Sequence, residues 1–136
     1  MALSKNEIKF VQSLRLKKFR QKYDNFIAEG EKIAGEALQQ RHFKVECIYA
    51  EKEWLDAHPG LGSLQPPPGI HEVSASELKK ISGLSTPNKV LMVLRPPDPQ
   101  QSRALSSGEL ALYLDDLQDP GNLGAVLRIA DWFGIR

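Results

Sequence analysis

Apolar residues alternate between helical and extended spacing over the first 94 residues, and this pattern predicts the elements. Ser4 and Glu7 have the spacing of a capping box, so we expect a helix to begin near Lys5. A second capping box, at Ser74 and Glu77, opens a helix that runs through Ile81. Elsewhere the pattern predicts strands over 25–30, 45–50, 70–75 and 89–94, helices over 31–42 and 52–60, and a proline-rich turn over 64–69.

Strands that alternate with helices predict an α/β fold, with a mostly parallel sheet covered on both faces. The segment 89–94, KVLMVL, is the most apolar strand and is expected at the centre of the sheet. This domain is predicted to cover 1–95. The proline, serine and glutamine content of 96–108 is typical of a linker, and a new unit covers 109–136.

The final stretch, LYLDDLQDPGNLGAVLRIADWFGIR, predicts a strand, a tight loop and a helix. Asn122 stands where an N-cap belongs, and Gly134 is expected to end the helix. Arg128 projects away from the helix face that is made by Leu123, Val126, Leu127 and Ala130. An arginine above a polar loop, at the carboxyl end of a strand, is well placed to meet a ligand.

Two other interpretations of this stretch remain open. Arg128 can pair with Asp131 three residues later, which would be an ordinary surface contact. Asp115, Asp116 and Asp119 can be considered as metal ligands, but they lack histidine and a fixed ligand spacing, so no metal is expected.

Charge is distributed unevenly although the net charge is only +1. Residues 1–22 hold seven Lys or Arg and one acid, whereas the remaining chain holds eleven basic and sixteen acidic residues. Such a segment is either a solvated helix face or a contact for a polyanion such as RNA. The candidate RNA-binding residues are Lys17, Lys18, Arg20, Lys22 and, in the sequence EGEK at a predicted helix start, Lys32. The start of that helix is either a phosphate-binding site or an ordinary strand-to-helix turn.

Composition excludes several other classes of protein. No apolar run is long enough to cross a bilayer, and the N-terminus lacks a signal-peptide core, so we expect a cytoplasmic protein with no membrane partner. Cys47 is the only cysteine, which leaves no internal disulfide.

The segment DDLQDPGNLGAVLRIADWFG resembles the first signature motif of the SpoU/TrmH family of RNA 2′-O-ribose methyltransferases. The matching positions are Asp119, Pro120, Asn122, Gly124, Arg128, Ala130, Phe133 and Gly134. Ile129 departs from the pattern, because many members have Thr or Ser there. The segments LKKFRQKYDNFIAEGEK and LSTPNKVLMVL are similar to the substrate-binding domain that precedes the methylase domain in many members.

This resemblance implies a small α/β/α sandwich similar to RNA-binding ribosomal proteins, followed by the first strand and helix of a trefoil-knot (SPOUT) domain. It also implies rRNA or tRNA as substrate, Arg128 and Asn122 as catalytic residues, S-adenosylmethionine as cofactor, and a homodimer for the full-length protein. The family's cofactor-binding motifs follow the first motif, so the cofactor site residues are unknown here. We expect that this chain alone binds no cofactor and is inactive. The alternative is a non-catalytic RNA-binding module of the ribosomal-protein type.

Overall fold

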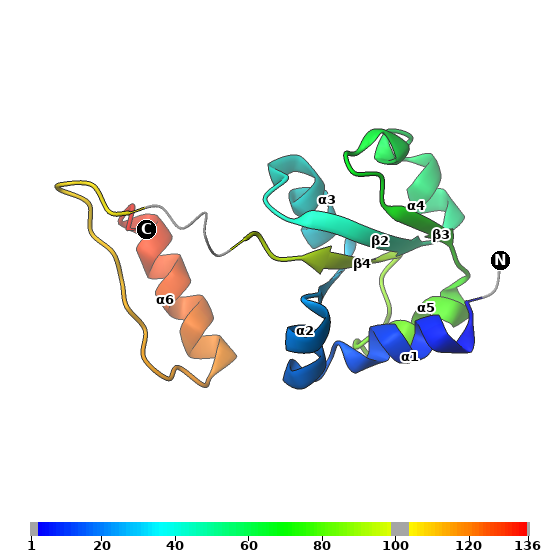
Figure 1. The fold of residues 1–136 in the computed structure, drawn as a ribbon, viewed down its shortest axis with the longest axis horizontal. Helices are drawn as coiled ribbons and strands as arrows, with labels where there is room; N and C mark the ends of the chain where they lie inside the picture. Colours follow the sequence, from blue (N-terminus) through cyan, green and yellow to red (C-terminus); the bar gives the residue numbers. More distant parts are fainter. Residues whose placement is uncertain (1–2, 99–103, 136) are drawn as a thin grey trace. The chain divides into compact units, whose positions relative to one another are not determined.

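The protein is described by a computed structural model that covers residues 3–98 and 104–135. The chain divides into two compact units, Met1–Asp98 and Pro99–Arg136 (Figure 1). Residues 99–103 of the predicted linker lie outside the described residues. Within the described ranges, no helix combines the length and apolar character needed to cross a membrane.

The first unit is built on a four-stranded sheet in the order β1-β4-β2-β3. Its strands are β1 (Phe26–Glu29), β2 (Lys44–Ala50), β3 (Gly69–Glu72) and β4 (Val90–Arg95). The predicted interior position of 89–94 is confirmed, because β4 lies between β1 and β2. The prediction of a mostly parallel sheet is wrong: β4 is antiparallel to both neighbours, and only β2 and β3 pair in parallel.

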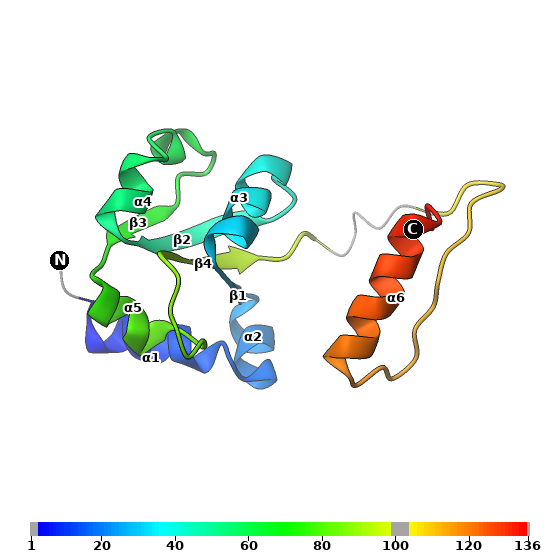
Figure 2. The same cartoon turned by 180° about the vertical axis from the view of Figure 1, so that it is seen from behind.

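The sheet is covered on both faces because alternate side chains of its two interior strands point to opposite sides. On one face, Ile48 and Met92 pack with residues of α3 (Glu31–Gln40) and with Trp54 of α4 (Lys52–Asp56). On the other face, Tyr49 and Leu91 pack with residues of α1 (Lys5–Ser13) and α5 (Ala75–Ile81). The two views in Figures 1 and 2 show these helix pairs on opposite sides of the sheet.

Local signals at the helix starts account for much of this arrangement. Both predicted capping boxes are confirmed. The Ser4 and Ser74 hydroxyls accept hydrogen bonds from the backbone N–H groups of Glu7 and Glu77. In return, each glutamate carboxylate accepts a hydrogen bond from the backbone N–H of its serine. A short 3-10 helix, η1 (Leu61–Ser63), follows α4 and contributes Leu61 to the core.

The second unit contains one helix among its described residues, α6 (Pro120–Trp132). It begins earlier than predicted, because Asp119 is the N-cap and accepts a hydrogen bond from Gly121 N at 2.7 Å, while Pro120 occupies the first helical position. Asn122 therefore lies inside the first turn and is not the N-cap. The predicted helix end is confirmed at Gly134, whose φ of 65° is left-handed.

The strand predicted before this helix is absent: described residues 104–119 form no strand. A strand requires a neighbouring ladder to satisfy its backbone N–H and C=O groups. None of the described residues of the second unit supplies that ladder, so the segment around Leu112 and Leu114 is irregular and both leucines are exposed.

Candidate RNA-binding surface and terminal motif

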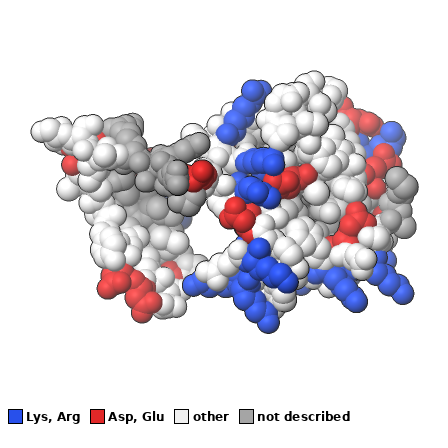
Figure 3. Space-filling view, viewed as in Figure 1, with Lys and Arg blue, Asp and Glu red and all other residues white. Residues whose placement is uncertain are grey.

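Four of the five predicted RNA-binding residues lie on one short helix, α2 (Lys17–Tyr23). Lys17, Lys18 and Lys22 are exposed, and the helix contains no acidic residue. Figure 3 shows Lys and Arg side chains gathered along the edge of the first unit where α1 and α2 lie. The structure thus presents the lysines of α2 at the surface of the first unit.

Arg20 differs from the lysines of α2 because its guanidinium is already engaged. Its Nη1 donates to the carbonyl oxygens of Leu14 at 3.0 Å and Arg15 at 2.7 Å, at the end of α1. These bonds satisfy helix-end carbonyls that lack an intrahelical partner. Arg20 therefore holds the turn between α1 and α2, and its contribution to an RNA surface is that of a fixed positive charge.

Arg15 has a comparable structural role that the sequence did not indicate. Its Nη2 donates to Ile81 O at 3.1 Å and also to Ser82 O, at the carboxyl end of α5. Nearby, the Glu29 carboxylate accepts hydrogen bonds from the Ser82 hydroxyl and from Gly83 N, the latter at 3.1 Å. These contacts bind α1, β1 and the loop before β4 together.

A pocket of about 440 Å³ opens beside these contacts, and it adjoins α2. Its lining combines two arginines with apolar side chains from the end of α1 and from β1: Leu14, Arg15, Arg20, Phe26, Ile27, Glu29 and Gly83. Four lining residues belong to the first segment that resembles the family's substrate-binding domain, namely Arg20, Phe26, Ile27 and Glu29, and the second segment begins directly after Gly83.

The fifth candidate, Lys32, is separated from this group, and two residues that follow α2 have structural roles. Lys32 is exposed on the first turn of α3, so it is carried by a different element from the other four. Phe26 packs against the core and meets the ring of Phe43 edge-on. Asn25 is buried and donates to Leu94 O at 3.4 Å. Phe26 and Asn25 therefore stabilise the first unit.

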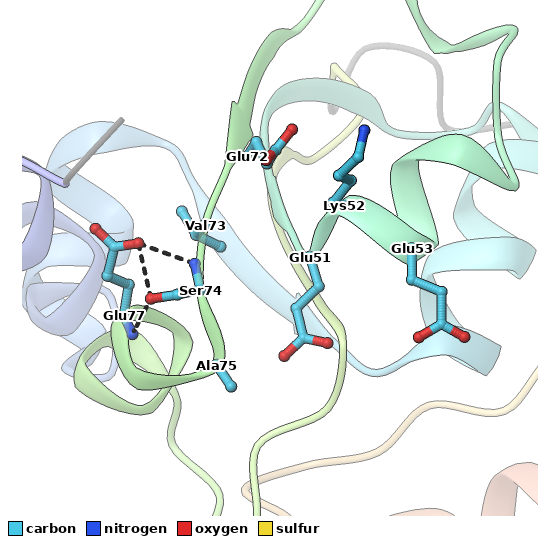
Figure 4. Close-up of a pocket in the computed structure, with 8 residues that line it drawn as sticks. All are labelled: Glu51, Lys52, Glu53, Glu72, Val73, Ser74, Ala75 and Glu77. Carbon is cyan, nitrogen blue, oxygen red and sulfur yellow. Dashed lines mark hydrogen bonds between the residues drawn. The ribbon is translucent and has the colours of Figure 1, made fainter.

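A second pocket of the first unit has the opposite electrostatic character. It measures about 600 Å³ and lies between the starts of α4 and α5 (Figure 4). Four glutamates and one lysine line it, together with Val73, Ser74 and Ala75: Glu51, Glu53, Glu72, Glu77 and Lys52. Hydrogen bonds from the backbone N–H groups of Ser74 and Leu3 lower the pKa of Glu77, which keeps it charged. This lining repels phosphate, so the pocket is not a site for RNA.

The terminal motif lies on α6, with Arg128 and Asn122 both exposed. Among the described residues, no ion pair or hydrogen bond engages the Arg128 guanidinium, so the alternative pairing with Asp131 does not form. A Cβ added at Gly124 would meet no atom within 4 Å, so the space one turn before Arg128 is open. Within the described ranges, no group of three or more His, Cys, Asp or Glu residues is placed to hold a metal ion.

The sequence of the first unit matches a known family over most of its length. The model of the MRM3-like substrate binding domain matches residues 5–92, which include β1, β2, β3 and the first half of β4. The chain belongs to this family. The MRM3-like domain therefore includes α2 with its basic surface as well as the pocket beside it.

Individual relatives extend the match beyond the MRM3-like domain into the terminal motif. The 23S rRNA (guanosine(2553)-2′-O)-methyltransferase RlmP of Bacillus subtilis is 27% identical over 97% of this chain. A solved structure from Porphyromonas gingivalis, described as an RNA methyltransferase of the TrmH family, is 35% identical over the whole chain with a TM-score of 0.79. An AdoMet-bound rRNA methyltransferase from Sinorhizobium meliloti is 25% identical over 99% of it, with a TM-score of 0.80.

This chain is shorter than those relatives. It covers 50% of RlmP and 51% of each of the two solved chains, so it spans about half the length of the relatives that it matches.

Proposed function

We propose that residues 1–136 bind and position structured RNA, and carry the first catalytic motif, for an S-adenosylmethionine-dependent 2′-O-ribose methyltransferase of rRNA or tRNA. The observation that carries the proposal is that one chain joins an MRM3-like substrate binding domain to the motif on α6. Relatives that span both parts are named as methyltransferases. A non-catalytic RNA-binding module is not favoured, because such a module has no need for the terminal motif.

The proposed division of labour follows the two units. Residues 1–95 form an RNA-binding domain of the sandwich type found in RNA-binding ribosomal proteins, and helices on both faces of its sheet support this. Residues 96–108 act as a linker, and 109–136 begin a trefoil-knot domain. A protein of the relatives' length would act as a homodimer in the cytoplasm, where its RNA substrates lie.

S-adenosylmethionine would supply the methyl group, and this chain alone is proposed neither to bind it nor to transfer the methyl group. We place the cofactor site in the half of the relatives that this chain does not cover.

Arg128 is proposed to act on the ribose 2′-hydroxyl of the RNA. This hydroxyl must lose its proton as its oxygen becomes a nucleophile, and a guanidinium with a pKa above about 12 is a poor base. Arg128 would instead fix the hydroxyl and stabilise the negative charge that develops on its oxygen, with loss of the proton aided by an adjacent phosphate. Asn122, in the first turn of the same helix, would hold the ribose or the loop.

RNA affinity at several salt concentrations tests the binding half of this proposal. Changing Lys17, Lys18 and Lys22 to Gln removes three exposed cations without touching the structural bonds of Arg20. Each phosphate contact to a single strand contributes about 0.7 to the slope of log K against log salt, so the slope should fall by about 2.

A matched control removes the same charge elsewhere. Lys44, Lys52 and Lys89 are each paired with a carboxylate, so their change to Gln should leave the salt slope unaltered. Equal slopes for the α2 variant and the wild type would reject α2 as the RNA-binding surface.

A further inference from the structure

The helix α2 carries aromatic rings that belong to neither hydrophobic core. Phe19 and Tyr23 are four residues apart, and their rings are stacked with centroids 6.2 Å apart and an interplanar angle of 12°. The Phe10 ring of α1 meets Tyr23 edge-on at 5.2 Å. Phe10 packs against the core, whereas Phe19 and Tyr23 appear in neither cluster of buried side chains or their packed neighbours.

Lysine side chains cover these same rings. Lys18 Nζ lies 4.9 Å from the centroid of Phe19, and Lys22 Nζ lies 5.3 Å from the centroid of Tyr23. A cation over an aromatic face gains about 0.5–1 kcal/mol at an exposed site, which is a weak and reversible contact. The rings are thus held by ammonium groups that can be exchanged for another partner at little cost.

Burial in the protein does not explain why aromatic residues occupy this helix. No residue of α2 is buried, Tyr23 is 38% exposed, and Leu16 at the helix start is 54% exposed. Within the described part of the chain, no carboxylate forms an ion pair with Lys18 or Lys22. Such an aromatic pair with neighbouring cations is complementary to a nucleotide, because the base offers a flat apolar face and the phosphate offers negative charge. The charge of α2 therefore selects a nucleic acid over an apolar protein partner.

We propose that Phe19 and Tyr23 form a stacking platform for an unpaired RNA base. When the base arrives, it replaces the ammonium groups on the ring faces, and Lys18 and Lys22 swing onto the flanking phosphates. The preferred RNA is a loop, a bulge or a single strand, because the bases of a continuous duplex are already stacked and their faces are closed. This inference rests on the proposed function, since it specifies the class of RNA that the α2 surface recognises.

The test compares two RNAs of equal length bound by the whole 136-residue chain, a hairpin with an unpaired loop and a fully paired duplex. Tyr23→Leu should weaken hairpin binding about tenfold, as expected for the loss of one base–aromatic stack, and leave duplex binding and the salt slope unchanged. Tyr23→Phe keeps the ring and should bind like the wild type. Tyr113→Leu removes a tyrosine that is 89% exposed in the second unit, and should change neither affinity.

A fluorescent 2-aminopurine base in the loop gives a second measurement that does not depend on affinity. At saturating protein its emission should be quenched by the wild type and by Tyr23→Phe, but not by Tyr23→Leu. The stacking proposal would be rejected if Tyr23→Leu lost equal affinity for the hairpin and the duplex, or if it still quenched the fluorescence. Either result would leave the proposed RNA contacts of the lysines standing. If the wild type binds neither RNA, both the platform and the proposed function are wrong.

Discussion

At Gly30 the chain passes from β1 directly into α3 with a φ of 115° and a ψ of 150°. This backbone region is essentially confined to glycine, because a Cβ clashes with the neighbouring peptide groups. A Cβ at this position would also approach Asn88 Nδ2 to 3.4 Å, in the loop before β4. Gly30 therefore permits a turn without a connecting loop and brings the start of α3 close to the loop before β4.

Replacing Gly30 by Ala should destabilise the first unit by about 1–3 kcal/mol, which is the cost of forcing a side chain into this backbone region. Gly35→Ala is the matched control: it lies within α3, where an added Cβ meets nothing within 4 Å, and should stabilise the unit by about 0.5–1 kcal/mol. Urea unfolding of both variants measures these values. If Gly30→Ala left the free energy of unfolding unchanged, the turn would be able to adopt another backbone conformation without cost.

Arg128 is the residue whose replacement tests the catalytic proposal, in a protein that joins this chain to the remaining half of its relatives' length. Arg128→Lys keeps the charge but loses the planar fork of donors, so it should fail nearly as badly as Arg128→Ala. Methyl transfer to RNA is the measurement, with folding and cofactor affinity checked separately. If Arg128→Ala retains more than about a tenth of the turnover, the loss is below about 1.4 kcal/mol and Arg128 is not catalytic.

Individual residue roles were only partly predictable from the sequence. Spacing alone placed Arg128 away from the apolar face of its helix, but it did not show that Asp119, rather than Asn122, would cap the helix. Similarly, Arg20 and Lys22 look equivalent in a basic run, yet only Arg20 reaches the carbonyl oxygens at the end of α1. Such roles depend on where a neighbouring helix ends in space.

At the scale of elements, the two capping boxes are the most dependable local signals. In the first, hydrogen bonds to the Ser4 side chain and backbone lower the pKa of Glu7 below its ordinary value of 4.5. Because the unfolded chain has the higher pKa, it binds more protons in this range. The stabilisation is therefore complete above the unfolded pKa, and it is lost as pH falls through the lowered pKa of the folded state.

Ser4→Ala should consequently destabilise the first unit by about 1 kcal/mol at pH 7. The difference in stability between Ser4→Ala and the wild type should become smaller below pH 4.5. There Glu7 becomes protonated, and the hydrogen bonds that its carboxylate makes with residue 4 weaken in both proteins. Thermal unfolding across this pH range is the measurement, with Ser85→Ala, in an exposed loop, as the control. A difference that stays constant with pH would mean that Glu7 does not contribute through its charge.

Strand direction was beyond what the element order could predict. The strands β1 and β2, which α3 connects, do run in the same direction, because each is antiparallel to β4. They are not neighbours, however, because β4 occupies the place between them. The run of apolar residues in 89–94 predicted an interior strand, and the first five residues of β4 are indeed buried. Pairing partners, however, are chosen by packing of the whole sheet.

At the scale of the whole molecule, the two units differ in how they are stabilised. Unit Met1–Asp98 has two clusters of buried side chains, whereas α6 contains no buried residue. Local opening is easiest where few apolar contacts must be broken. Amides of 110–133 should therefore exchange with solvent faster than those of Val90–Leu94. Hydrogen exchange on the 136-residue chain is the measurement, and equal protection in a monomer would contradict this expectation.

The interior position of β4 has a consequence for biosynthesis. A ribosome releases β1 and β2 well before β4, so for much of translation both strands lack the partner that lies between them in the finished sheet. The nascent chain cannot complete this sheet stepwise from its N-terminus, because the strand that joins its two sides is the last to be synthesised. Until β4 is released, the edges of β1 and β2 that pair with it in the finished sheet are open to association.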